Sequence, residues 1–491
     1  MSSQCEKEPL EFNDLQVNGK NDISMKDGYA PPAHNSQSSD EASPLAIEEV
    51  TYPEGGLQAW IVVFGAFCGT AASIGLYNTS GFFEVYMSES LLPNQSASNV
   101  GWIFGIYAFV TWFLGVLVGP TFDAFGPTAL MLAGGICMVS GMVALSASTG
   151  ECRSISWPSQ ETADIETEYY QIILAFSILT GTGTSLVVNP ANASVVHWFN
   201  ERRGLASGIA WVGSGIGGVM FPLMLQSLLP QIGWTWSLRA LALVQFCLCG
   251  ISIALCRTRV PPRPGTWRNI LPTARIFMDG TGAMAVTTAG VVLTDIAYFI
   301  PVTYIPKYYL VRQHLSTDET LIGSSAFAYQ LLAISNASSI IGRLFAGAVS
   351  DQLGRYNTMI ISLFFCAASV LCFWLPDIIT DDVSNIGLLL SFVILFGCVS
   401  GSNTSLFPVC VGQLCEVQDY GRYYATCYTV VSFGVLISTP IAGALLDAVE
   451  AEGKRKFWGV AVFTGLCYVA ATLCFVWVRW RMKGPSLKIK W

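Results

Sequence analysis

Two ionisable residues lie inside long apolar segments, where a charge costs at least ~2.5–3.5 kcal/mol to insert into a lipid bilayer. Asp295 falls near the middle of the apolar run 282–305, and Arg343 falls in the second half of the run 321–348. The planar guanidinium of Arg343 suits an anion, with a nearby carbonyl or the loop residue Asp351 as the alternative partner. These two positions predict a binding or gating site for an anion within a membrane.

Amide side chains lie close to prolines at matching places in two further apolar runs. Asn189 and Asn192 flank Pro190 in the first run, and Asn403 stands ahead of a proline in the second. Broken membrane helices that line a binding cavity have such features, so we expect these three amides at the site. Tyr298 is a candidate for an aromatic wall of the same pocket, with simple packing as the alternative.

The chain lacks the residue clusters that metal sites and catalytic centres need. Its three histidines, His34, His197 and His314, are scattered, and its fifteen cysteines include no CxxC pair. Most of the cysteines lie in apolar runs, where a free thiol behaves as a small hydrophobe. A phosphate-binding loop that ends in Gly-Lys-Ser/Thr is also missing. We therefore expect no metal, no cofactor, no enzyme activity and no ATP-driven pump.

The composition is that of a protein dissolved mainly in lipid. Of the 491 residues, 52% are hydrophobic and 12% are charged, whereas soluble domains carry about 25% charged residues. The mean hydropathy is +0.51. The net charge of −8 and the lack of a basic patch argue against a nucleic-acid partner.

From residue 57 onward, apolar runs alternate with short polar breaks. Each run is about 20 residues long, the length that crosses ~30 Å of hydrocarbon. The runs lie at 57–83, 99–119, 127–147, 169–197, 203–229, 236–256, 282–305, 321–348, 356–376, 385–408, 421–446 and 457–479. They predict an all-α integral membrane protein with twelve transmembrane helices in two six-helix halves.

The composition also divides the chain into five parts. We predict a disordered cytoplasmic tail at 1–50, a six-helix half at 51–256, a cytoplasmic linker at 257–281, a second six-helix half at 282–479 and a cytoplasmic tail at 480–491. The first tail has few large apolar residues, so burial cannot offset the entropy of ordering it. The linker is rich in proline and arginine.

Lys and Arg are more frequent in the loops on one side of the predicted membrane. This bias places both termini in the cytoplasm. The cluster Lys454, Arg455 and Lys456 falls on the outer side and opposes the bias. The even number of helices and the long central linker still favour the same orientation.

Five Asn-x-Ser/Thr sequons occur, and their positions separate one from the rest. Those at Asn78, Asn192, Asn336 and Asn403 lie inside or at the edge of apolar runs, where glycosyltransferase cannot reach. Asn94 lies in a loop predicted outside. It is therefore the candidate glycosylation site, with an unused sequon as the alternative.

A motif with the same spacing follows the second and the eighth predicted helix. Its residues are Gly119, Asp123 and Gly126 in the first copy, and Gly347, Asp351, Gly354 and Arg355 in the second. The glycines permit a tight turn, and the aspartate can cap the next helix and bond a neighbouring arginine. The pair resembles the loop signature of the major facilitator superfamily. That resemblance implies two halves that rock about a central site, with these bonds holding the outward-open state.

Two further motifs stand before the first and the fifth predicted helix. Residues 54–60 read EGGLQAW, and residues 197–208 read HWFNERRGLASG, which includes the basic pair Arg202 and Arg203. Together they resemble the two signatures of the monocarboxylate transporter family, in its fungal branch. This resemblance implies a secondary carrier in which Arg343 receives the carboxylate of the substrate.

The chain departs from that family at two positions. Proton-coupled animal members carry an aspartate four residues before this arginine, where Ser339 stands here, and a lysine near the outer end of the first helix, where 74–80 has none. Asp295 is a hypothetical proton acceptor in their place. At a rise of 1.5 Å per residue, its depth in the membrane differs from that of Arg343 on the neighbouring helix by about 10 Å, so direct pairing is not expected.

The resemblance implies a carrier of a small organic compound in the cell membrane, or else in a vacuolar or vesicular membrane. Three substrates compete: a short monocarboxylate, riboflavin, and a fungal secondary metabolite that is exported. The missing lysine and aspartate favour export of a secondary metabolite or a larger organic anion, with protons as a possible coupling ion. A transport-inactive sensor is the alternative of a different class. No obligate protein partner is indicated.

Overall fold

The computed structural model describes residues 55–148, 169–199, 202–259, 274–278, 280–314, 326–380, 386–415, 420–449 and 453–484. The predicted N-terminal tail and most of the predicted linker lie outside these ranges. Within them, the regular secondary structure consists of helices alone.

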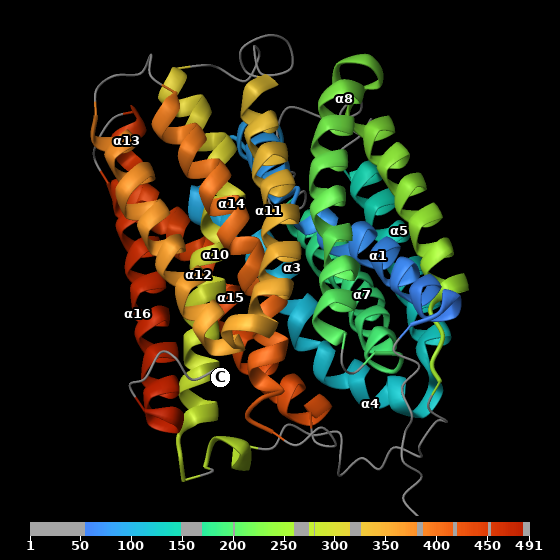
Figure 1. The fold of residues 1–491 in the computed structure, drawn as a ribbon. Helices are drawn as coiled ribbons and strands as arrows, with labels where there is room; N and C mark the ends of the chain where they lie inside the picture. Colours follow the sequence, from blue (N-terminus) through green and yellow to red (C-terminus); the bar gives the residue numbers. More distant parts are fainter. Residues whose placement is uncertain are drawn as a thin grey trace, which may run out of the picture. The chain divides into compact units, whose positions relative to one another are not determined.

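The first half of the chain forms long apolar helices, blue to green in Figure 1. Its elements are α1 (Leu57–Tyr77), α2 (Ser80–Tyr86), η1 (Met87–Leu91), α3 (Ala97–Phe113), α4 (Gly115–Phe125), α5 (Pro127–Ser148), η3 (Ile173–Thr180), α7 (Gly181–Val196) and α8 (Arg203–Leu255). A straight helix of the 53 residues of α8 would be about 80 Å long, more than twice the thickness of the hydrocarbon. Gly233 interrupts it with φ 72° and ψ 176°, so α8 comprises two spans.

The second half repeats this arrangement, yellow to red in Figure 1. Its elements are η4 (Ala274–Phe277), α10 (Ala283–Gln313), α11 (Ala326–Leu353), α12 (Arg355–Ser369), η6 (Val370–Trp374), α13 (Leu375–Ile379), α14 (Gly387–Val411), α15 (Tyr420–Ala448), η8 (Gly453–Phe457) and α16 (Trp458–Lys483). The described residues contain 11 helical segments long and apolar enough to span a membrane. Dividing α8 at Gly233 raises this to twelve, which confirms the predicted architecture.

The two halves contact each other mainly through two pairs of helices. α3 packs against α15, and α8 packs against α11. The backbones approach closely: a Cβ atom on Gly101 of α3 would lie only 2.8 Å from the carbonyl oxygen of Thr439 in α15. A glycine is therefore needed for this contact, because any larger residue would push the halves apart.

The prolines do not break their helices, contrary to the sequence-based expectation. Pro190 lies inside α7, and Pro408 lies inside α14. In α7, the side chains beside the proline donate to carbonyls of their own helix: Asn189 Nδ2 to Ser185 O at 3.0 Å, and Asn192 Nδ2 to Val188 O at 2.9 Å. Neither bond reaches the carbonyl of Leu186, which loses its usual donor at Pro190, and α7 nevertheless continues to Val196.

α10 extends to Gln313, eight residues beyond the predicted end at 305. We call the end of the helices that carries Asn94 the outer end, following the predicted orientation, and the opposite end the inner end. At the outer end, Arg312 is fully buried and binds Asp377 of α13 with two nitrogens, Nε to Oδ2 at 3.0 Å and Nη2 to Oδ1 at 3.1 Å. Because Asp377 of α13 neutralises its charge, Arg312 can lie buried in the part of α10 that extends beyond the predicted end.

Lys454 belongs to the same outer-end cluster. Its ammonium donates to the backbone carbonyl of Asp377 at 3.0 Å, and its side chain is buried. Tyr308 donates its hydroxyl to Asp377 Oδ2 at 2.5 Å. Lys454 therefore has a structural partner at the outer end, which explains why a lysine opposes the charge bias there.

Replacing Arg312 by Met should destabilise the protein by about 3–5 kcal/mol, because Asp377 would remain buried without its cation. The measurement is thermal unfolding of the purified protein in detergent. Lys456→Met removes an exposed cation three positions after the start of η8 and serves as the control. Equal midpoints for the two variants would contradict the prediction.

Candidate functional site

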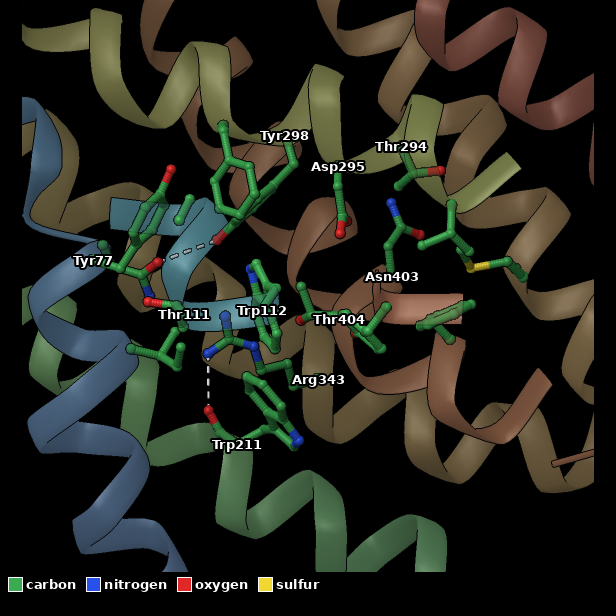
Figure 2. Close-up of a pocket in the computed structure, with 18 residues that line it drawn as sticks. Tyr77, Thr111, Trp112, Trp211, Thr294, Asp295, Tyr298, Arg343, Asn403 and Thr404 are labelled. Atoms are coloured by element: carbon green, nitrogen blue, oxygen red, sulfur yellow. Dashed lines mark hydrogen bonds between the residues drawn. The ribbon is translucent and has the colours of Figure 1, made fainter. Parts of the chain in front are cut away.

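A closed cavity lies at the interface of the two halves (Figure 2). Its walls come from α1, α3 and α8 of the first half and from α10, α11, α12, α14 and α15 of the second. Its volume of about 30 Å³ has room for roughly two water molecules and not for an organic compound. The structure therefore represents a closed conformation, and the halves must move apart before a substrate can enter.

Arg343 projects from α11 into this region and is 1% exposed. Its Nη1 donates to the carbonyl of Trp211 at 3.0 Å and to Ser214 Oγ at 2.7 Å, both on α8 of the other half. Among the described residues its Nε is buried without a hydrogen-bond partner, and no carboxylate lies within ion-pair distance. In the closed conformation the cation is thus held by neutral oxygens across the interface.

Asp295 lines the same cavity from α10 (Figure 2). It is half-buried, and no hydrogen bond or ion pair joins its carboxylate to the part of the chain that the structure describes. It does not pair directly with Arg343. The cavity therefore presents a cation and a carboxylate as separate groups.

Tyr298 links the cavity wall to the other half. Its hydroxyl donates to Asn78 Oδ1 at 3.3 Å, and Asn78 Nδ2 donates to the carbonyl of Ser214 at 3.1 Å. Asn336 Nδ2 donates to the carbonyls of Gly218 at 3.2 Å and Asn78 at 3.4 Å. Asn78, Ser214 and Asn336 were not among the predicted site residues. Two of them are amides within apolar runs, the same feature that marked Asn403.

Two aromatic pairs of the cavity wall join the halves. Towards the outer end, Tyr77 contacts Phe299 edge to face, with ring centroids 4.5 Å apart. Towards the inner end, Trp112 stacks on Tyr428 at 4.8 Å. Each pair joins one ring from the first half to one from the second, so each must separate when its end of the cavity opens.

The other predicted site residues divide into two groups. Asn403 lines the cavity, where its Nδ2 lies 3.4 Å from Cys366 Sγ and its Oδ1 has no partner among the described residues. Asn189 and Asn192 do not line it and bond their own helix. Ser339 bonds the carbonyl of Asn336 at 2.7 Å within α11. The cavity thus brings together Arg343, Asp295, Tyr298 and Asn403.

The repeated motif forms the two equivalent turns at the inner end. Gly126, between α4 and α5, has φ 75°, and Gly354, between α11 and α12, has φ 94°, values that glycine adopts without strain. Gly119 lies in α4 and Gly347 in α11, while Arg202 and Arg355 are exposed. The side chains of Asp123, Arg203 and Asp351 lie outside the described part, so the expected Asp–Arg bonds stay a prediction.

Asn94 is exposed in the turn between η1 and α3. The other four sequon asparagines lie in helices or, for Asn78, at a helix end. Glycosylation of Asn94 stays a prediction.

The outer end also carries an ion pair between the halves. Lys307 Nζ lies 2.8 Å from Glu84 Oε1, with side-chain exposures of 18% and 0%. The pair joins α10 to α2, so it must break if the outer end opens. This contrasts with the Arg312–Asp377 pair, which lies within the second half.

Sequence comparison identifies relatives that match most of the chain. A profile described as Major Facilitator Superfamily matches residues 65–411 and 319–490. The riboflavin transporter MCH5 of Saccharomyces cerevisiae is 30% identical over 496 aligned residues, which cover 95% of this chain and 89% of that protein. The fujikurins efflux protein of Gibberella fujikuroi is 30% identical over 469, covering 95% and 91%. The MFS transporter asaE of Aspergillus flavus is 30% identical over 439, covering 89% and 90%.

Solved structures resemble the fold at low sequence identity. The nucleoside transporter NupG superposes with a TM-score of 0.61 at 15% identity, covering 86% of this chain and 99% of that one. A bacterial homologue of the iron transporter ferroportin, in its outward-facing state, gives 0.59 at 11%, with the same coverage. At these identities the likeness concerns the fold alone.

Replacing Lys307 by Met should loosen the outer end between the halves, because Glu84 would stay buried without its cation. Amide hydrogen exchange in α2 and in the outer end of α10 should rise about tenfold. Arg312→Met is the matched control, since it removes an ion pair within one half and should raise exchange in α13 and η8 instead. Identical exchange patterns in the two variants would refute the assignment of Lys307 to the interface.

Proposed function

The chain belongs to the major facilitator superfamily and transports a small organic compound across a membrane, and we propose that this compound is an organic anion that is exported. The placement of Arg343 carries the proposal. Among the described residues that line the cavity, Arg343 alone carries a positive charge. Its Nε has no hydrogen-bond acceptor in the described part of the chain. An anion would supply that acceptor through a charge-assisted hydrogen bond.

The aromatic walls of the cavity support a flat, unsaturated body for this anion. Trp112, Trp211 and Phe407 line the cavity together with Tyr77 and Phe299. Aromatic faces gain most from stacking and edge contacts with another ring system. A short aliphatic acid would leave most of these rings without contact, so a larger aromatic or conjugated anion fits the cavity better once it has opened.

Alternating access accounts for how such a compound would cross. The inner end opens when Trp112 separates from Tyr428, and the anion enters beside Arg343. The halves then close, and the outer end opens when Tyr77 leaves Phe299 and Lys307 leaves Glu84. The fungal relative named as an efflux protein supports this outward direction.

A second candidate is import of a flavin-like compound or a monocarboxylate. The yeast relative named as a riboflavin transporter supports it, at the same identity as the efflux relative. The motifs at 54–60 and 197–208 support a place in the fungal monocarboxylate-transporter-like branch. Ser339 argues against lactate-type symport, because it offers no carboxyl group and bonds its own helix.

Asp295 is our candidate for the group that carries a coupling proton. Its carboxylate faces the cavity with Arg343 and Tyr298 and has no partner in the described residues. A carboxylate in such a place can take up a proton from whichever side the cavity faces. Export would then be driven by protons that enter as the anion leaves.

Arg343→Ala should reduce export at least about tenfold, because the anion loses its charged partner. Arg343→Lys should keep part of the activity, since it retains the charge without the planar fork. The measurement is efflux of fluorescein, a planar aromatic anion, from loaded fungal cells, together with the metabolites secreted with and without the gene. The fluorescence of a tagged protein would show whether it is in the cell membrane or a vacuolar membrane.

Arg239→Ala is the control for charge alone, because Arg239 is exposed and stacks on Trp236, and neither residue lines the cavity. If Arg343→Ala exported fluorescein as fast as the wild type, the anion contact would be wrong. Uptake instead of efflux, measured with labelled riboflavin and lactate, would favour the second candidate.

Asp295→Asn should remove the dependence of transport on external pH, because an amide cannot carry the proton. Rates would be compared at pH 5 and pH 7. Thr294→Ala is the matched control, since Thr294 also lines the cavity but bonds the carbonyl of Gly290 in its own helix at 2.8 Å. If the ratio of the transport rates at pH 5 and pH 7 were the same in Asp295→Asn as in the wild type, Asp295 would be excluded as the proton carrier.

A further inference from the structure

Hydrogen-bond donors and acceptors beside the cavity are divided between the two halves. The second half supplies the donors, which are Nη1 of Arg343 and the hydroxyl of Tyr298. The first half supplies the acceptors, which are the carbonyl of Trp211, Oγ of Ser214 and Oδ1 of Asn78. All five residues are buried. These bonds therefore hold the halves together around the cavity.

On the basis of the proposed function, we propose that Ser214 and Asn78 accept the hydrogen bonds of Arg343 and Tyr298 only until a substrate binds and takes their place as acceptor. The anion replaces the first half as the acceptor for Arg343 and Tyr298. The bonds across the interface are then exchanged for bonds to the substrate and are not simply lost. Ser214 and Asn78 are thus positioning residues that link binding to separation of the halves.

The strengths of the two sets of bonds favour this exchange. Ser214 Oγ and the carbonyl of Trp211 are neutral acceptors, so an anion adds a charge–charge attraction to Arg343 that they lack, and it makes a charge-assisted hydrogen bond with the Tyr298 hydroxyl. An anionic substrate can therefore displace Ser214 from Arg343, whereas an uncharged compound of the same shape cannot. A carboxylate or an enolate beside a ring has the required chemistry, because two oxygens can receive the two donors.

A separate contact keeps the two helices aligned while this exchange takes place. Asn336 lies seven residues before Arg343 on α11, so both project from one face of that helix. Asn336 binds the carbonyls of Gly218 and Asn78 and does not line the cavity. A substrate in the cavity meets Arg343 and not the Asn336 side chain, so α11 and α8 remain in register when Arg343 changes its partner.

The exchange predicts effects of opposite sign for variants in the two halves. Ser214→Ala removes an acceptor that competes with the substrate, so half-saturation should occur at about fivefold lower fluorescein concentration. Tyr298→Phe removes a donor that the substrate needs, so the half-saturating concentration should rise about fivefold. Binding is measured on the purified full-length protein by quenching of tryptophan fluorescence, since Trp112 and Trp211 line the cavity.

Ser227→Ala is the matched control on α8, because among the described residues Ser227 Oγ bonds the carbonyl of Met224 in its own helix and no group of the other half. It should bind fluorescein as the wild type does. If Ser214→Ala bound fluorescein as weakly as Tyr298→Phe, or with unchanged affinity, the exchange would be overturned. If Arg343→Ala bound it as tightly as the wild type, or if the wild type did not bind it, the proposed anion contact would fail as well.

Discussion

The structure depends on burying one guanidinium between two halves that must later separate. A cation at this depth needs hydrogen-bond acceptors from the protein, because lipid supplies none. Arg343 finds them in Trp211 and Ser214 of the opposite half. A carboxylate in their place would leave a buried charge without its partner each time the halves parted, at a cost of several kcal/mol. Neutral oxygens stabilise the closed conformation without making it permanent.

The two ion pairs of the outer end follow the same distinction. Arg312 and Asp377 make two contacts within one half, and both are almost completely buried. Lys307 and Glu84 make one contact between the halves, and the lysine remains partly exposed. Water can therefore reach Lys307 as the pair breaks, which lowers the cost of breaking it. The stronger pair preserves the second half as a rigid unit, and the weaker pair lies where motion is required.

The architecture could be predicted from the sequence because the thickness of the bilayer fixes the length of each apolar run. Arg343 and Asp295 were recognisable for a related reason, since charge is costly in such runs. Ser214 could not be assigned, because its bond to Arg343 joins residues 129 positions apart and leaves no local pattern. Asn78 has the local feature that marked Asn403, but its bond to Ser214 spans 136 positions and could not be foreseen. The effect of Pro190 was misjudged, since the loss of one backbone hydrogen bond does not end a helix that is packed between α1 and α5.

The small volume of the closed cavity has a consequence for the membrane itself. Room for roughly two waters, with ring pairs on both sides, leaves no continuous file of water along which protons could hop. A wider passage filled with water would let protons leak across the membrane and dissipate the electrochemical gradients that a cell maintains. In this closed conformation the cavity therefore acts as an insulator. Tight aromatic packing serves the impermeability of the bilayer as much as the recognition of a solute.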